Sequence, residues 1–288
     1  MAGRTARLTP DFTPFTPDHA GPVREFADLV ARADGIEAFG EQTLFNLASP
    51  SVTHLLLTKP GAIVAYGQID RHSAELAVHP QYRRNGIGGA LLDAVKARDA
   101  RAAIWAHGDL PGARALARSR SLNPTRELVY MSADLDPSAR LPQVPAGMTL
   151  TTFTESDASD WLRVNAAAFA DHPEQGRLTH ADLQERISQP WFDPRVFWLA
   201  RDDSGELLGY MWVKREPGAD TAEIYVLGVS PTAQGRGVGK FLTEYALAHM
   251  ATVGVTTMDL YVEGDNAPAL ATYTRYGFTR AITHVQYT

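Results

Sequence analysis

The sequence predicts an α/β protein built from two similar domains in tandem. The chain has 288 residues, about twice the usual length of a single domain, so two hydrophobic cores are expected. One sequence phrase also occurs in both halves, at residues 75–89 and again at residues 226–240, with Gly86 and Gly237 standing 151 positions apart. Arrays of small repeats use units of roughly 20 to 50 residues, so this longer period indicates a duplicated domain.

A proline-rich segment separates the two copies. Residues 134–145 contain three prolines and no apolar periodicity, which is typical of a linker. We therefore predict an N-terminal domain over residues 1–139, a C-terminal domain over residues 147–288 and a linker at about residues 134–146.

Strand, loop and helix follow one another in each half. Apolar runs flanking turn residues predict one hairpin in each half, formed by residues 55–57 with 62–66 and by residues 197–200 with 207–213. After each copy of the phrase, apolar residues recur with the spacing of an amphipathic helix, starting at Ile87 and at Val238. Each half is therefore predicted to be α/β.

Composition and charge exclude several classes of protein. Hydrophobic residues make up 44% of the chain, and it has neither an apolar run long enough to span a membrane nor a signal peptide; we expect a cytoplasmic protein without membrane contact. The absence of cysteine excludes disulfides, thiolate metal ligands and a cysteine nucleophile. The net charge of −6 argues against nucleic acid as a partner. His107 and His172 lack a second ligand at suitable spacing, so we expect no metal site. Separately, we expect the protein to be a monomer.

The shared phrase contains a glycine loop that follows a strand and opens a helix. It reads Gln234-x-x-Gly237-x-Gly239 in the second half and Arg83-x-x-Gly86-x-Gly88 in the first. Free backbone N–H groups at a helix start form a cradle for an anion such as a phosphate, and glycines allow a close approach. The alternative is a plain strand-to-helix turn. The spacing matches neither the dinucleotide-binding fingerprint nor the Walker A loop.

This loop resembles the acetyl-CoA pyrophosphate loop of the GNAT superfamily of N-acetyltransferases. The resemblance implies a mixed central sheet flanked by helices in each half, and acetyl-CoA as co-substrate. In the second half it extends to the closing motif N-x-x-A-x-x-x-Y-x-x-x-G-F, carried by Asn266, Ala269, Tyr273, Gly277 and Phe278. Asn266 is expected to cap a helix and Gly277 to end it.

Acetyl transfer to an amine needs a base, stabilisation of the oxyanion and a proton for the leaving thiolate. We expect Glu223, near the start of the strand before the second loop, to be the base, on the same face as Tyr225, Leu227 and Val229. Main-chain amides near Gly228 are expected to bind the oxyanion, with Gly228 allowing an irregular strand. The resemblance implies that Tyr273 supplies the proton.

The two halves are not equivalent. Aligning residues 108–122 with the closing motif puts Ala117 at the position of Tyr273, so the proton donor is missing from the first half. We therefore predict that the N-terminal half can bind acetyl-CoA but does not catalyse transfer. The simpler alternatives are that Tyr273 is a core aromatic residue and Glu223 an exposed residue at a strand end.

Four further segments, at residues 105–108, 164–176, 191–194 and 223–229, resemble tandem GNAT enzymes of mycothiol biosynthesis. The resemblance implies acetyl transfer to the cysteinyl amine of a cysteine-glucosamine-inositol conjugate, the last step of that pathway. It implies acceptor contacts by Glu41, Glu174, Lys214, Glu223 and Tyr261. It implies acetyl-CoA contacts in the first half by Leu76, Ala77, Val78, Arg84, Asn85, Gly86, Ile87, Gly88 and Gly89. In the second half the implied acetyl-CoA contacts are Leu227, Gly228, Val229, Gln234, Gly235, Arg236, Gly237, Val238, Gly239, Lys240, Asn266, Ala267, Pro268, Ala269, Leu270 and Ala271.

Other functions stay open at this point. The same fold could acetylate the N-terminus of a peptide or protein or the amine of an antibiotic, because the fold alone names no substrate. A protein that binds acyl-CoA in both halves without catalysis is a further alternative, against which Glu223 and Tyr273 argue. Glu41 could also be part of a solvated helix face.

Overall fold

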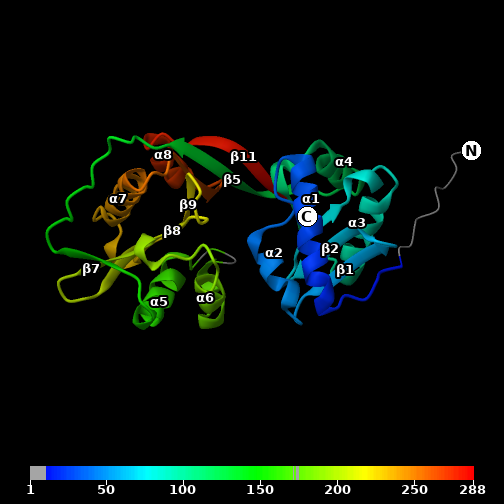
Figure 1. Ribbon diagram of the computed structural model, residues 1–288, viewed down its shortest axis with the longest axis horizontal. Helices are drawn as coiled ribbons and strands as arrows, with labels where there is room; N and C mark the ends of the chain where they lie inside the picture. The colour runs from blue at the N-terminus through cyan, green and yellow to red at the C-terminus, as the bar shows by residue number, and fades with distance from the viewer. Residues whose placement is uncertain (1–10, 171, 173–174) are drawn as a thin grey trace, which may run out of the picture. The chain divides into compact units, whose positions relative to one another are not determined.

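The computed structural model describes residues 11–170, 172 and 175–288 (Figure 1). The chain forms two compact units. The first consists of Met1–Val129, Glu263–Asp265 and Ile282–Thr288, and the second of Tyr130–Val262 and Asn266–Ala281. The marked C-terminus therefore lies among the blue and cyan elements of the first unit in Figure 1. This division differs from the predicted one, in which the chain end belonged to the second domain, because strand pairing connects segments that are distant in sequence.

The first unit is a mixed sheet with the strand order β1-β2-β3-β4-β11. Its strands β3 and β4 are parallel, and the pairs β1–β2, β2–β3 and β4–β11 are antiparallel. The strands are β1 (Thr53–Lys59), β2 (Ala62–Asp70), β3 (Ser73–Val78), β4 (Ala103–Ala106) and the end of β11 (Thr279–Tyr287). The helices are α1 (Ala20–Asp34), α2 (Glu41–Phe45), α3 (Ile87–Arg98) and α4 (Pro111–Ser119).

Helices cover both faces of this sheet. Neighbouring strand residues point to opposite faces, and Leu55 and Leu56 accordingly belong to different core clusters. Leu56 packs in the cluster that contains Val23 of α1, whereas Leu55 packs in the cluster that contains Leu91 of α3. The layered α/β arrangement predicted for this half is therefore present.

The second unit repeats the plan, with the strand order β5-β10-β9-β8-β7-β6. The strands are β5 (Pro124–Asp134, which begins in the first unit), β6 (Met148–Thr152), β7 (Phe197–Asp202), β8 (Leu207–Lys214), β9 (Thr221–Val229) and β10 (Thr257–Glu263). The helices are α5 (Ala158–Ala168), α6 (His180–Ile187), α7 (Val238–Thr252) and α8 (Ala267–Arg275). Residues 135–147, between β5 and β6, form neither helix nor strand.

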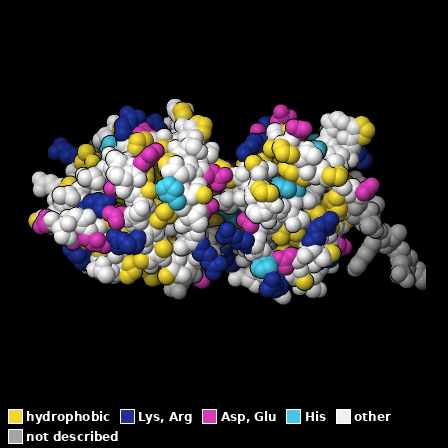
Figure 2. Space-filling view, turned by 90° about the horizontal axis from the view of Figure 1, so that it is seen from below, with side chains coloured by type: hydrophobic (Ala, Val, Ile, Leu, Met, Phe, Trp, Pro, Cys, Tyr) yellow, Lys and Arg dark blue, Asp and Glu magenta, His cyan; other side chains and the backbone are white. Residues whose placement is uncertain are grey.

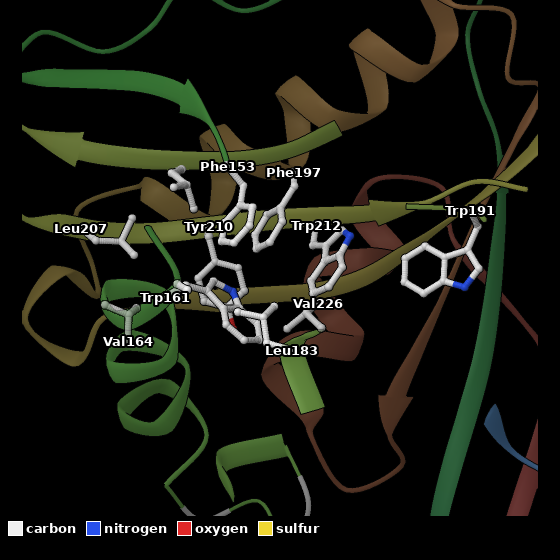
Figure 3. Packing of buried hydrophobic residues seen from close by; sticks show 12 residues of the cluster. Phe153, Trp161, Val164, Leu183, Trp191, Phe197, Leu207, Tyr210, Trp212 and Val226 are labelled. Carbon is white, nitrogen blue, oxygen red and sulfur yellow. The ribbon is translucent and has the colours of Figure 1, made fainter. Parts of the chain in front are cut away.

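An aromatic cluster forms much of the core of the second unit. Phe197 stacks on Phe153 and on Trp212, with ring centroids 4.5 and 4.4 Å apart, and Figure 3 shows the three rings side by side. Trp161 of α5 packs edge-on against Phe197 and Tyr210. Such aromatic pairs stabilise a core beyond the apolar area that they bury. This core holds α5 against β7 and β8.

The local elements predicted from the sequence are confirmed. Both hairpins form, as β1–β2 and β7–β8, and the helices after the glycine loops are α3 and α7. No helix in the described part of the chain is long and apolar enough to span a membrane. On the face that Figure 2 shows, acidic and basic side chains are interspersed with each other.

Candidate active site

Two parallel strands separate near their carboxyl ends in each unit. In the second unit β9 and β10 pair from Thr221–Thr257 to Ile224–Leu260, and β9 then continues to Val229 outside this pairing. In the first unit β3 and β4 pair at Ser73–Ala103 and Ala74–Ile104, and β3 continues to Val78. Each unit therefore has a strand segment, just before its glycine loop, whose main chain is available to a ligand.

In the first unit this opening is part of a cavity of about 530 Å³, a size suited to a small ligand. The cavity is lined by seven of the residues predicted to bind acetyl-CoA in this half: Leu76, Ala77, Val78, Arg84, Gly86, Gly88 and Gly89. The facing wall includes Ile104, Trp105 and Ala106 of β4 and Ala117 of α4. Seven of the nine predicted residues therefore share one concave surface; Asn85 and Ile87 do not line it, and acetyl-CoA binding there stays a prediction.

The two glycine loops have the same backbone conformation. Gly86 and Gly237 both have φ of 80°, in the left-handed region, and each directly precedes its helix. Two residues earlier, Arg84 and Gly235 also have positive φ, 65° and 76°. The arginines Arg84 and Arg236 are both exposed at these helix starts, where free N–H groups attract anions. The two loops therefore share one geometry, which is compatible with the predicted phosphate binding.

In the loop of the first unit, Arg83 connects helix α1 to the end of strand β3. Arg83 donates two hydrogen bonds to Asp34 of α1, at 2.6 and 2.7 Å, and its Nε donates to the carbonyl of Val78. These bonds tie α1 to the strand end, and Asp34 compensates the charge of Arg83. The second unit has Gln234 at this place.

Strand β9 contains a β-bulge that β3 lacks. Trp212 of β8 pairs with Val226, but the next β8 residue, Val213, pairs with Ile224, so Tyr225 is the extra residue. The corresponding pairing of β2 with β3 runs without interruption from Ala65–Val78 to Asp70–Ser73. A bulge bends the strand and frees main-chain groups, and bulges are frequent next to active sites.

We predicted the strand irregularity at Gly228, and this prediction was wrong. The bulge lies three residues earlier, at Tyr225. Gly228 pairs regularly with Tyr210. A Cβ at Gly228 would lie 2.5–2.6 Å from atoms of the Tyr210 ring, so the glycine allows a close approach between neighbouring strands. Tyr210 cannot move easily, because it is fully buried and donates a hydrogen bond to Asn165 at 2.6 Å.

A charged and aromatic patch surrounds the bulge, and we call Lys214, Glu223, Trp191 and Tyr225 the bulge patch. Glu223 and Tyr225 lie on the half-exposed face of β9, as predicted, and Lys214 is the cross-strand partner of Glu223. The Lys214 Nζ lies 5.0 Å from the ring centroid of Trp191, and that ring is 5.0 Å from Tyr225. Cation–π contacts of this kind hold an ammonium in place. Figure 3 shows Trp191 set apart from the stacked core rings.

Helix α8 has the predicted ends. The Asn266 side chain accepts a hydrogen bond from the Ala269 amide at 3.1 Å, Pro268 stands in the first turn, and Gly277 follows the helix with φ of 87°. Tyr273 packs edge-on against Phe278, with ring centroids 5.7 Å apart. Burial raises the pKa of Tyr273 to about 12, so its phenol is protonated at neutral pH.

The alignment of α4 with α8 is confirmed by hydrogen bonds. The Ala117 carbonyl accepts from the amides of Arg120 and Leu122, and the Tyr273 carbonyl accepts from Tyr276 and Phe278 in the same pattern. Ser121 has a positive φ of 55°, as Gly277 does. Ala117 thus stands at the position of Tyr273, without a hydroxyl group.

The residues predicted to bind acetyl-CoA in the second unit lie at one edge of its sheet. Strands β9 and β10 are parallel, so their carboxyl ends meet at the same edge. Strand β9 leads into the loop at residues 234–240, and β10 leads into the start of α8 at residues 266–271. Ligands of α/β sheets bind at this edge.

The residues expected to contact the acceptor are distributed over both units. Lys214, Glu223 and Tyr261 belong to the second unit, where Tyr261 is 38% exposed and its ring lies 5.0 Å from that of Tyr130. Glu41 is the first residue of α2 in the first unit. Glu174 lies outside the described residues.

Some residues of this region were missed by the sequence reasoning. Trp191 and Tyr225 were quoted only as parts of motifs, and Glu75 only as part of the shared phrase, with no role given to any of them. A tryptophan before Phe-Asp-Pro was the available signal for Trp191, but its contact with Lys214 depends on tertiary structure. Among the described residues no group of acidic or histidine side chains is arranged to hold a metal ion.

Comparisons with known proteins agree with this architecture. The model of the Acetyltransferase (GNAT) family matches residues 161–278, and that of an Acetyltransferase (GNAT) domain matches residues 50–124. A tandem GNAT protein from the clavulanic acid biosynthesis pathway is similar in structure, with a TM-score of 0.71 and 22% identity over 96% of this chain and 97% of that one. The protein is thus a tandem GNAT acetyltransferase.

Relatives define the family more narrowly. The mycothiol acetyltransferase of Clavibacter michiganensis subsp. michiganensis is 44% identical over 99% of this chain and 95% of the relative. The mycothiol acetyltransferase of Beutenbergia cavernae is 45% identical over 93% of this chain and 95% of the relative. The chain belongs to the mycothiol acetyltransferase family.

Proposed function

We propose that the second unit transfers the acetyl group of acetyl-CoA to the cysteinyl amine of a cysteine-glucosamine-inositol conjugate, the last step of mycothiol biosynthesis. The observation that supports this most is an asymmetry. Both units have a glycine loop, but only in the second does the strand before the loop contain a bulge and Glu223, and only the second has a phenol, Tyr273, where the first has Ala117. The family of the chain supports the choice of acceptor.

The second glycine loop has the task of holding the diphosphate of acetyl-CoA. Backbone N–H groups at residues 234–240 face the anion at the start of α7, and Arg236 and Lys240 add positive charge nearby. Acetyl-CoA supplies the activated acetyl group. The open segment of β9, at residues 227–229, aligns the arm that carries it.

Glu223 acts as the general base in this proposal. It removes a proton from the ammonium of the acceptor, directly or through one water, and leaves a neutral amine as nucleophile. Lys214 lies opposite Glu223 on β8, held by the Trp191 ring, so the patch carries both signs of charge. Main-chain amides of residues 227–229 that face away from β8 stabilise the oxyanion.

Tyr273 acts as the general acid. Its phenol is protonated at neutral pH because burial raises its pKa to about 12, and it gives its proton to the departing thiolate. Its position two turns into α8 follows from the cap at Asn266. No cysteine is present, so transfer goes directly from acetyl-CoA to the amine.

An acceptor with one ammonium group and two polyhydroxylated rings needs carboxylates and hydrogen-bonding groups. Glu41, Glu174, Lys214, Glu223 and Tyr261 supply groups of this type, and we assign acceptor binding to them. The cavity of the first unit binds a second acetyl-CoA without turnover, because Ala117 replaces the acid. We place the enzyme in the cytoplasm as a monomer.

Release of the CoA thiol tests this function. The purified chain is supplied with acetyl-CoA and one of three amines: the cysteine-glucosamine-inositol conjugate, glucosamine-inositol or a peptide with a free N-terminus. We expect kcat/KM for the conjugate to exceed that for the other amines by at least about 100-fold, since their missing groups leave binding residues unpaired. Equal values for the peptide would contradict the assigned acceptor.

A further inference from the structure

A largely buried chain of three titratable side chains lies in the first unit, outside the groups assigned to catalysis. The His107 Nε2 lies 3.1 Å from Oε1 of Glu75, and the His107 Nδ1 lies 2.9 Å from Nδ1 of His284. Glu75 stands on β3, His107 directly follows β4, and His284 belongs to β11. The three strands are thereby joined by polar contacts within one unit.

The contacts within this chain shift the pKa of each member. Burial opposes ionisation of both Glu75 and His107, but their mutual attraction holds the pKa of Glu75 below and that of His107 above its ordinary value. Burial, together with the charge of His107, lowers the pKa of His284 to about 4. The two imidazoles thus share a hydrogen bond between their Nδ1 atoms, and the Nε2 side of His107 pairs electrostatically with the Glu75 carboxylate.

The carboxylate of Glu75 also holds the start of α2. Its Oε2 accepts a hydrogen bond from the backbone amide of Gly40 at 2.9 Å, and it bonds to the side chain of Thr43. Gly40 is the N-cap residue of α2, with no side chain of its own to cap the helix. A Cβ at Gly40 would lie 3.1 Å from Oε1 of Glu75, which shows how closely the carboxylate approaches.

The residue between these two anchors is Glu41. It follows Gly40 directly and precedes Thr43 by two positions, so the carboxylate of Glu75 holds the backbone amide before it and a side chain after it. A second contact supports the same helix, because the Gln68 side chain donates to the Thr43 carbonyl at 3.0 Å. A helix of five residues has little stability of its own and depends on such contacts.

We infer that Glu75, His107 and His284 are positioning residues for the acceptor: they hold α2 so that Glu41 is placed to bind the substrate. This inference depends on the proposed function, in which Glu41 is an acceptor contact. In this inference the three residues act on the acceptor through Glu41 and not by direct contact, although His107 also lines the cavity of the first unit. Their effect reaches the reaction through the backbone of residues 40–43, in the way that supporting hydrogen bonds fix a binding group.

Steady-state kinetics of Glu75→Gln, Glu41→Gln and the double variant test the inference. The Glu75→Gln substitution keeps the shape of the side chain but removes the negative charge beside His107. We expect Glu75→Gln to raise the KM for the conjugate about 10-fold, with kcat and the KM for acetyl-CoA within about twofold of the unsubstituted chain. The double variant should be no worse than Glu41→Gln, since residues that act together are not additive.

A matched control and a structural readout separate positioning from general instability. Asp99→Asn breaks the exposed His72–Asp99 pair of the same unit, which does not touch α2, and should leave the KM for the conjugate unchanged. In Glu75→Gln and in the milder His284→Gln, amide hydrogen exchange should accelerate at residues 40–45 and stay unchanged in α3.

The outcomes are distinguishable. If Glu41→Gln raises the KM for the conjugate and Glu75→Gln does not, or if their effects multiply, the positioning role is overturned while the proposed function stands. If Glu41→Gln itself changes nothing, the assignment of Glu41 is wrong and the chain of three has no acceptor contact to position. Uniformly faster exchange over the whole first unit would also overturn it, as a general effect on folding.

Discussion

Two helix-opening loops, at Gly86 and Gly237, share one backbone conformation, while the strands before them differ. Strand β9 has Glu223 and a bulge at Tyr225, whereas β3 is regular and has Ser73 in the place of Glu223, since each lies one residue before the last β3–β4 or β9–β10 pair. At the matching position of the last helix, the second unit has the phenol of Tyr273 and the first unit has Ala117, which has no hydroxyl group. The loop conformation occurs in both units, whereas Glu223, the bulge and Tyr273 occur in the second, so the proposed ligand binding and the proposed chemistry depend on separable features.

Among the substitutions that test this comparison, Glu223→Gln should lower kcat the most. Loss of the base leaves the acceptor as an ammonium, so we predict a kcat about 100- to 10,000-fold lower in a thiol-release assay. Ser73→Ala, at the equivalent position of the first unit, is the control and should be silent. A turnover of Glu223→Gln close to that of the unsubstituted chain would remove this residue from the mechanism.

Tyr273→Phe should lower kcat by about 10- to 1000-fold, with little change in the affinity for acetyl-CoA, because only the acid is lost. Since the pKa of Tyr273 is raised to about 12, its phenol stays protonated from pH 7 to 10 and should cause no alkaline decline of kcat in that range. Ala117→Tyr in the first unit should add no turnover, because β3 has Ser73 at the position equivalent to Glu223 and has no bulge. Unchanged activity of Tyr273→Phe would contradict the role of the phenol.

The matched pair Gly237→Ala and Gly86→Ala sharpens the comparison of the loops. Both glycines have φ of 80°, where a side chain costs roughly 1–2 kcal/mol, so both substitutions distort their cradles. We predict that Gly237→Ala raises the KM for acetyl-CoA about 10-fold. Gly86→Ala should weaken acetyl-CoA binding in the first unit, measured by calorimetry, and leave turnover intact. A loss of turnover in Gly86→Ala would show that the first cradle is needed for catalysis.

Gly228→Ala should have the smallest of these effects. We expect it to lower the free energy of unfolding of the chain. The new methyl group would lie within 2.6 Å of the buried Tyr210 ring, and overpacking of this kind costs about 1–3 kcal/mol. The equivalent pair of the first unit is Tyr66 with Ala77, which already accommodates a methyl group. Thermal unfolding measures the difference; an unchanged midpoint would show that Tyr210 can move.

Sequence patterns predicted the features of this fold that are local in the chain. The hairpins, the helices after the loops and the ends of α8 follow from turn residues, apolar spacing and caps within a few positions of each other. Alignment of the two halves also placed Ala117 correctly at the position equivalent to Tyr273. Periodicity also put Glu223, Tyr225 and Val229 on one face of β9.

Features that depend on distant segments could not be predicted in this way. Residues 282–288 complete the sheet of the first unit through pairs such as Val285 with Ala106, which no local signal encodes. The bulge at Tyr225 is defined by the register with β8, and the sequence pointed to Gly228 because glycine often marks irregular strands. The contact of His107 with His284 likewise joins residues 177 positions apart.

The most direct measurement is the turnover of the Glu223→Gln/Tyr273→Phe double variant, with acetyl-CoA binding counted by calorimetric titration on the same sample. If the second unit alone performs the chemistry, thiol release falls to the background rate while the acetyl-CoA stoichiometry stays that of the unsubstituted chain. Acetyl transfer at an appreciable fraction of the original rate would place the reaction elsewhere in the molecule and contradict the division of tasks between the two units.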